Sequence, residues 1–311
     1  MSSTTALAGR YVLVDQIGAG GMGSVWRAWD LKQETYVAAK LLGRHDQSLL
    51  LRFVREQSVR VHHPHVVAPS GWAAEDHQVV LTMDLVRGGS VADLARDHGP
   101  LPAAYVAVLL DQLLQALDAV HSAGVVHRDV KPANLLLEVT GSGRPHLRLS
   151  DFGIAALVDD VRLTQSPGPI GTRWYAAPEQ AEGGALPDPR QDLYAVGVLA
   201  TGLLTGLSPH HRPPPPPGPL QPLVTALTAR NPDDRPASAA AALERLRRVG
   251  VPPGAPWQTD PGPPVVPDRL GDPAPDRRAR SADPGRASSL LAIGCFVLAI
   301  ALSLGALTRL L

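Results

Sequence analysis

The sequence predicts an α+β fold in which a small antiparallel sheet precedes a mainly helical region. Short runs that alternate apolar and polar residues fill the chain from residue 11 to about 87. Apolar residues at helical spacing dominate from 88 to about 248. The 311 residues suit one large domain with appendages, or two domains.

The strands are predicted where alternation is clearest, in YVLVDQIG, SVWRAWD, TYVAAKLL and QVVLTMDLV. One interruption, SLLLRFVREQSVRV, has helical spacing and predicts a single helix among these strands. Further on, the long apolar stripe that ends at Gly124 and the alanine-rich segment that ends at Gly250 predict helices with glycine stops. QDLYAVGVLATGLLTG predicts another helix between them.

Composition excludes several classes of function. The formal net charge is zero, so no basic excess points to a nucleic-acid partner. Cys295 is the only cysteine, which rules out an intramolecular disulfide and a cysteine-based zinc site. The remaining partners are small molecules, proteins or a membrane.

Two carboxy-terminal segments differ from the rest of the chain. Residues 250–287 hold ten prolines and no apolar periodicity, which predicts a disordered linker. Residues 289–308 carry no charge and are long enough to cross about 30 Å of hydrocarbon, which predicts a transmembrane helix. The alternative, a buried core helix, would have no partner beyond such a linker. More arginines precede this span than follow it, so the folded region is expected in the cytoplasm of a single-pass protein. Ala301 and Gly305 form one small-xxx-small pair that could support helix pairing in a homodimer, and the alternative is incidental packing in an alanine-rich segment.

A glycine-rich stretch, IGAGGMGSV, follows the first predicted strand. Gly18, Gly20 and Gly23 let the backbone approach phosphates without a Cβ in the way. A dinucleotide-binding loop would open a helix at once, whereas here a second strand-like run follows. The pattern therefore predicts a strand-loop-strand flap over phosphates.

Lys40 ends the next predicted strand, in VAAK. A buried ammonium group requires a carboxylate, and Glu56 in the predicted helix is available. Lys40 could then contact the α- and β-phosphates of a nucleotide. The alternative is a surface lysine at a strand end.

The stretch GVVHRDVKPANLLLEV spans residues 124–139 and packs three polar groups between apolar runs. In phosphoryl transfer, Asp129 could orient an acceptor hydroxyl, Lys131 could neutralise the moving charge, and the amide oxygen of Asn134 could bind a cation. Asp151, in HLRLSDFG, would supply a second and stronger metal ligand.

Taken in order, GAGGMGSV, VAAK, FVRE, HRDVKPAN, DFG, AAPE and NPDDRP resemble the bacterial eukaryotic-like (Hanks-type) serine/threonine protein kinases that are tethered to the membrane. The resemblance covers residues 11–248. It implies the bilobal protein kinase fold, with an N-lobe at about 11–87 and a C-lobe at about 88–248. It also implies ATP and Mg²⁺, or Mn²⁺ in its place, as cofactors, and proteins as substrates.

The resemblance assigns roles by position. Catalysis falls to Asp129 and Lys131, with the ion pair of Lys40 and Glu56, and the metal ligands are Asn134 and Asp151. Met83 is the gatekeeper, the backbone of Asp84 and Val86 meets the adenine edge, and Val25, Ala38 and Leu136 enclose the adenine ring. The implied ATP-binding residues are Ile17, Gly18, Ala19, Gly20, Gly21, Met22, Gly23, Val25, Ala38, Lys40, Met83, Asp84, Val86 and Leu136. Structural support is implied for Thr172, Glu179, Asp192 and Arg235, with Glu179 paired to Arg235.

Regulation and docking complete the expectations. Arg128, before the catalytic aspartate, suggests a phosphate on the activation segment, and we expect Thr164 and Ser166 to be autophosphorylated. The stretch 203–222 is shorter than in the family and its proline run cannot be helical, so substrate docking there could differ from that of the family. The main alternative to a catalyst is a pseudokinase-type nucleotide-binding scaffold. The complete polar set favours catalysis.

Overall fold

The computed structural model describes residues 6–20, 23–42, 61–75, 78–151, 174–181, 186–211 and 213–272. By its internal contacts the chain divides into a unit at 1–271 and a second at 272–311. The predicted transmembrane span, 289–308, and the predicted helix at about 48–61 therefore lie outside the described residues, apart from residue 61.

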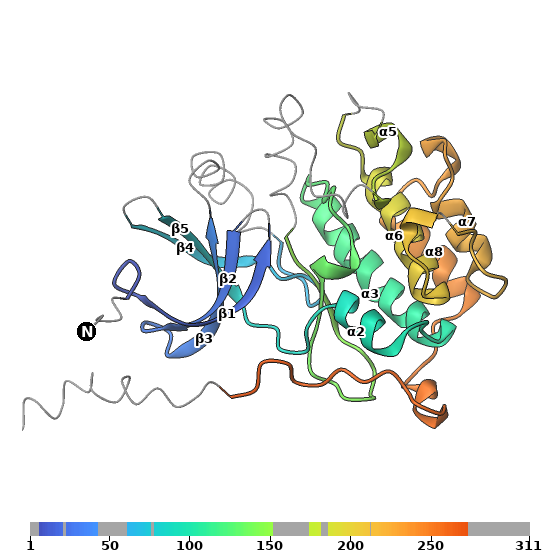
Figure 1. The fold of residues 1–311 in the computed structure, drawn as a ribbon. Helices are drawn as coiled ribbons and strands as arrows, with labels where there is room; N and C mark the ends of the chain where they lie inside the picture. Colours follow the sequence, from blue (N-terminus) through green and yellow to red (C-terminus); the bar gives the residue numbers. More distant parts are fainter. Residues whose placement is uncertain are drawn as a thin grey trace, which may run out of the picture. The chain divides into compact units, whose positions relative to one another are not determined.

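The amino-terminal sheet has five antiparallel strands in the order β1-β2-β3-β5-β4 (Figure 1). Their bounds are Tyr11–Gly20 for β1, Gly23–Asp30 for β2, Thr35–Leu42 for β3, Pro69–Glu75 for β4 and Gln78–Asp84 for β5. In the register, Lys40 of β3 lies between Val25 of β2 and Leu81 of β5. The sheet confirms the predicted strand-rich region and the predicted hairpin of the first two strands.

The helical region follows the sheet, as the sequence predicts (Figure 1). Its helices are α2 Val91–His98, α3 Ala103–Ser122, α5 Pro178–Ala181, α6 Pro189–Thr205, α7 Gln221–Leu227 and α8 Ala239–Val249. A short second sheet pairs β6, Leu135–Leu137, with β7, Leu147–Leu149. Between α6 and α7 the chain has only the 3-10 turn Pro209–His211 and irregular backbone among its described residues.

Local sequence sets the ends of these helices. Ser90 and Asp93 form a capping box at the start of α2, and the Ser238 hydroxyl caps α8. Asp188 caps α6, whose first residue is proline. Gly206 ends α6 in the left-handed conformation, with φ of 69°.

The main core is built around α3, which buries twelve of its residues. Asp111, Gln115 and Asp118 recur at helical spacing on the one face of α3 that is only partly buried, and the buried remainder of the helix is almost entirely apolar. Within the described part of the chain, α3 is the one helix long and apolar enough to cross a membrane, and it is mostly buried inside the fold.

Residues 250–272 correct the prediction of a disordered linker from 250 to 287. Trp257 and Val266 are each about 1% exposed, and the 3-10 turn Pro256–Thr259 surrounds the tryptophan. The composition argument concerned a segment folding alone. Here two separated apolar side chains instead bury themselves on the existing domain. We call residues 251–271 the carboxy-terminal strap.

Candidate active site

The glycine-rich hairpin needs glycine at its first β2 position. Gly23 has φ of 134°, and a Cβ there would overlap the carbonyl oxygen of Leu41 on β3. A register shift between Gln16 and Gly18 bends β1 just before the turn. Gly21 and Met22, at the tip, lie outside the described residues.

The apolar residues assigned to adenine gather in one cluster. Ala38, Met83 and Val86 belong to its buried part, and Ile17, Val25 and Leu136 pack against it. These six residues come from four strands, β1, β2, β3 and β5, from the segment that follows β5, and from β6. The cluster therefore spans the sheet and the first strand of the helical region, which suits a flat apolar ring.

Lys40 makes an ion pair with Asp151 across these two regions. The Nζ atom lies 2.7 Å from Oδ1 of Asp151, and the lysine side chain is only 6% exposed. Asp151 has φ of 61°, a left-handed conformation that is uncommon outside glycine and typical of constrained functional positions. The predicted partner Glu56 lies outside the described residues.

Asp129 is held by both polar neighbours in its loop. Its Oδ2 accepts from Lys131 Nζ at 2.8 Å and from Asn134 Nδ2 at 3.0 Å. Its Oδ1 is buried and has no hydrogen-bond partner among the described residues. A buried acceptor left open in this way is ready for an incoming donor such as a hydroxyl group.

The donor set also fits a divalent cation bound together with phosphates. Asn134 uses its Nδ2 on the carbonyl and the carboxylate of Asp129, which leaves its amide oxygen as the group for a cation. The carbonyl of Asn134 accepts from the backbone and hydroxyl of Ser150, at 2.9 and 3.0 Å, which ties this loop to the residue before Asp151. Two oxygen ligands suit Mg²⁺, which retains water and phosphate ligands. The described residues hold no group of three His, Cys, Asp or Glu side chains suited to a metal ion.

Asp192, in the first turn of α6, holds the backbone that directly precedes Asp129. Its carboxylate accepts from the backbone N–H groups of His127 and Arg128 at 2.8 and 2.7 Å, and from His121 Nε2 at 2.8 Å. The Asp192 side chain is 1% exposed. Arg128 adopts φ of 64°, so these bonds hold a strained backbone immediately before Asp129.

His127 supplies a second brace, which the sequence reasoning missed. Its Nδ1 accepts from the Asp129 backbone at 3.2 Å, and its Nε2 then donates to the Ser150 carbonyl at 3.0 Å. The side chain is fully buried, so this pattern fixes one tautomer. The sequence feature that could have indicated this role is the position of His127, two residues before Asp129 in an apolar run. The contact of His121 with Asp192 had no comparable signal.

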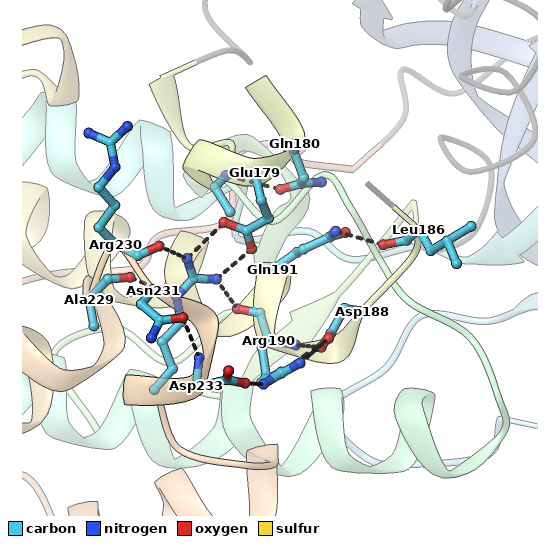
Figure 2. Close-up of polar contacts among 12 residues, drawn as sticks. Glu179, Gln180, Leu186, Asp188, Arg190, Gln191, Ala229, Arg230, Asn231 and Asp233 are labelled. Atoms are coloured by element: carbon cyan, nitrogen blue, oxygen red, sulfur yellow. Dashed lines mark hydrogen bonds and ion pairs between the residues drawn. The ribbon is translucent and has the colours of Figure 1, made fainter. Parts of the chain in front are cut away.

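Arg235 and Glu179 form a bidentate ion pair in the helical region. The two distances are 2.7 and 2.8 Å, and the Arg235 side chain has no exposed surface. Figure 2 shows Glu179 in this network beside Ala229, Arg190 and Arg230, whose carbonyls accept the other Arg235 donors. Burial raises the pKa of Glu179, but the bonds from Arg235 and the backbone outweigh it and hold the pKa below its ordinary value.

Of the remaining residues that the resemblance assigns, the structure describes some and not others. Asp84 contributes a carboxylate that pairs with Arg148 of β7 at 2.6 Å. Ala19 and Gly20 end β1 at the hairpin. Thr164, Ser166 and Thr172 lie outside the described residues.

A sheet and a helical region joined by these polar contacts define the kinase-like class of α+β fold. The chain belongs to the protein kinase domain family, which matches residues 11–215. Bacterial serine/threonine-protein kinases are similar to it over much of its length. They include PkaA of Streptomyces coelicolor, 37% identical over 74% of this chain and 48% of that protein, and PknB of Mycobacterium leprae, 34% identical over 82% and 46%. PknA of Mycobacterium tuberculosis is 32% identical over 90% of this chain and 74% of its own length. The chain thus spans about half the length of the first curated relatives it matches.

Proposed function

We propose that this protein is a serine/threonine protein kinase that transfers the γ-phosphate of ATP to hydroxyl groups of protein substrates. The observation that carries the proposal is the open, buried Oδ1 of Asp129 beside Lys131 and Asn134. Membership of the protein kinase domain family and similarity to bacterial serine/threonine kinases support it.

The residues divide the work in a way that follows from their contacts. Asp129 accepts the hydroxyl of the substrate through Oδ1 and orients it, while Lys131 stays beside Oδ2 to balance negative charge. Lys40, fixed by Asp151, presents its ammonium group to the α- and β-phosphates. Asn134 and Asp151 would hold Mg²⁺, or Mn²⁺, which when bound neutralises the phosphate oxygens.

We further propose that Thr164 and Ser166 are autophosphorylated. Arg128 supports this, because its Nε is buried and has no hydrogen-bond partner among the described residues. A guanidinium group in that state suits a phosphate from a nearby segment. Phosphosite mapping of active enzyme that finds neither residue modified would remove this proposal.

Membrane attachment is part of the same proposal. The apolar stretch 289–308 would anchor the chain as a single-pass protein, with the kinase domain in the cytoplasm and pairing of the anchors as a route to a homodimer. Fractionation of cells that express the full chain, beside a variant lacking 289–308, tests it. Equal recovery of both in the soluble fraction would contradict the anchor.

A pseudokinase-type scaffold is the competing reading, and one comparison decides between them. The full chain is incubated with labelled ATP and Mg²⁺, beside Asp129→Asn, Lys40→Met and the matched surface control Asp260→Asn. We expect Asp129→Asn to lower incorporation by about 10²–10⁴-fold, the range for loss of a positioned acid–base group. Lys40→Met should weaken incorporation as strongly, and Asp260→Asn should match the parent. Equal incorporation by all four proteins would refute the catalytic assignment.

A further inference from the structure

The strap is anchored at one end to the helical region. The ring of Trp257 packs edge-on against Tyr105 of α3, with centroids 4.7 Å apart, and its Nε1 donates to the Ser142 carbonyl at 3.0 Å. Arg144 donates to the carbonyls of Pro252 and Gly254 at 2.7 and 3.1 Å. This end is therefore held by a fully buried aromatic residue and by three hydrogen bonds.

The middle of the strap lies on the segment that joins the sheet to α2. Arg269 donates its backbone N–H to the Arg87 carbonyl at 2.9 Å, and Asp268 pairs with the Arg87 guanidinium at 2.6 Å. Two glycines make room for it. A Cβ on Gly88 would lie 2.6 Å from Val266 Cγ1, and one on Gly89 would overlap the Arg269 side chain. The joining segment and the strap thus fit against each other closely.

The far end of the strap reaches the sheet. Asp268 Oδ1 accepts from the N–H groups of Leu270 and Gly271, both at 3.0 Å, and this shapes a turn. The Gly271 carbonyl then accepts from Arg27 of β2 at 2.9 Å and from Arg87 at 3.0 Å. Arg27 is 5% exposed and is fixed by Asp15 at 2.6 Å. One carbonyl group therefore joins the sheet to the segment that follows β5.

We propose that the strap is a positioning element of the kinase, which fixes the angle between the sheet and the helical region and so sets the shape of the ATP-binding cluster. The proposal rests on the proposed function, because the cluster is the assigned adenine site. Two lobes with a small interface are expected to move relative to each other unless further contacts restrain them. The strap supplies such contacts on the segment that carries Val86, a member of the cluster.

The charge and geometry select Asp268 as the key strap residue. Its carboxylate both pairs with Arg87 and forms the turn that presents the Gly271 carbonyl to Arg27. Its side chain is one-third exposed, at 34%, so Asp268→Ala leaves no buried cavity. Asp260, also exposed on the strap, gives the matched Asp260→Ala control.

The test measures the distance between lobes without any nucleotide. Cys295→Ser removes the only native cysteine from the full chain, and Leu31→Cys and Leu207→Cys, at sites 49% and 51% exposed, accept spin labels in the two lobes. Electron double-resonance spectroscopy then gives the distance distribution. We expect Asp268→Ala to increase the width of this distance distribution at least twofold. The distribution of Asp260→Ala should coincide with that of the parent.

Kinetics on the unlabelled full chain provides the second readout. Asp268→Ala should raise the KM for ATP three- to tenfold with less than a twofold change in kcat, which a loss of stability alone would not produce below the melting temperature. An unchanged distance distribution or an unchanged KM in Asp268→Ala overturns the proposal. A parent protein that transfers no phosphate counts against the proposed kinase function, while the distance measurement still decides the role of the strap.

Discussion

Replacing Glu179 by glutamine should test how strongly the buried ion pair holds the helical region together. Arg235 uses all five of its N–H donors. Two go to Glu179, and the others go to the carbonyls of Ala229, Arg190 and Arg230. Because the Arg235 side chain is fully buried, Glu179→Gln leaves its charge without the carboxylate that is hydrogen-bonded to it. Removal of one partner of such a pair costs about 3–5 kcal/mol. Glu179 is itself partly exposed, so we expect a loss near the lower limit of that range.

That loss is large enough to measure by thermal unfolding. For a domain of this size, each kcal/mol shifts Tm by about 2–4 °C, so Tm should fall by about 6–12 °C. The matched control is Glu244→Gln, which breaks the exposed pair with Arg248 on α8 at 3.0 Å. Such surface pairs contribute at most about 0.5 kcal/mol. Equal melting temperatures for the parent and Glu179→Gln would refute the reasoning.

The same pair predicts a pH dependence with a defined sign. The pKa of Glu179 is lower in the folded protein than its ordinary value. Its contribution is therefore complete above the unfolded-state pKa, about 4.3, and is lost as pH falls through the lower folded-state pKa. The difference in Tm between the parent and Glu179→Gln should narrow below about pH 4.

Three further substitutions test separate parts of the site and the strap. Asp192→Asn removes one acceptor from the brace under His127 and should lower kcat about tenfold while the KM for ATP stays constant, measured by steady-state kinetics; an unchanged kcat would contradict the brace. Gly23→Ala should cost about 1–3 kcal/mol because of its φ of 134° and its overlap with the Leu41 carbonyl, measured by denaturant unfolding; a neutral effect would count against the hairpin geometry. Trp257→Ala should cost about 3–5 kcal/mol if the strap is part of the domain, whereas a free linker would show no change in melting.

The parts of the site that the sequence could predict are those whose partners are close along the chain. Asp129, Lys131 and Asn134 lie within six residues, so their spacing alone brings them together. The strand register that places Lys40 beside Val25 likewise follows from one hairpin. Side chains of this kind are constrained by local backbone, which sequence patterns report directly.

Long-range contacts were not open to the same reasoning. The pair of Lys40 with Asp151 joins residues 111 positions apart, and His121 reaches Asp192 across 71. The sequence alone allowed other surroundings for these side chains: Lys40 could have paired with Glu56 or lain at the surface, for example. Only the packing of α3 against α6 decides where His121 lies, and no short pattern contains that information.

The strap shows that amino-acid composition can predict the lack of regular secondary structure in a segment without predicting whether that segment packs on a neighbouring domain. Proline and glycine at 250–272 do prevent regular secondary structure beyond one short turn. They do not prevent binding, because an extended segment exposes carbonyl groups that arginine and histidine side chains can reach. Arg144, His98 and Arg27 each donate to such a carbonyl. Trp257 then contributes, from one residue, the apolar burial that a helix would spread over several. A proline-rich segment next to a folded domain should therefore be judged by its isolated aromatic residues and by the cations on the neighbouring surface, as well as by its mean composition.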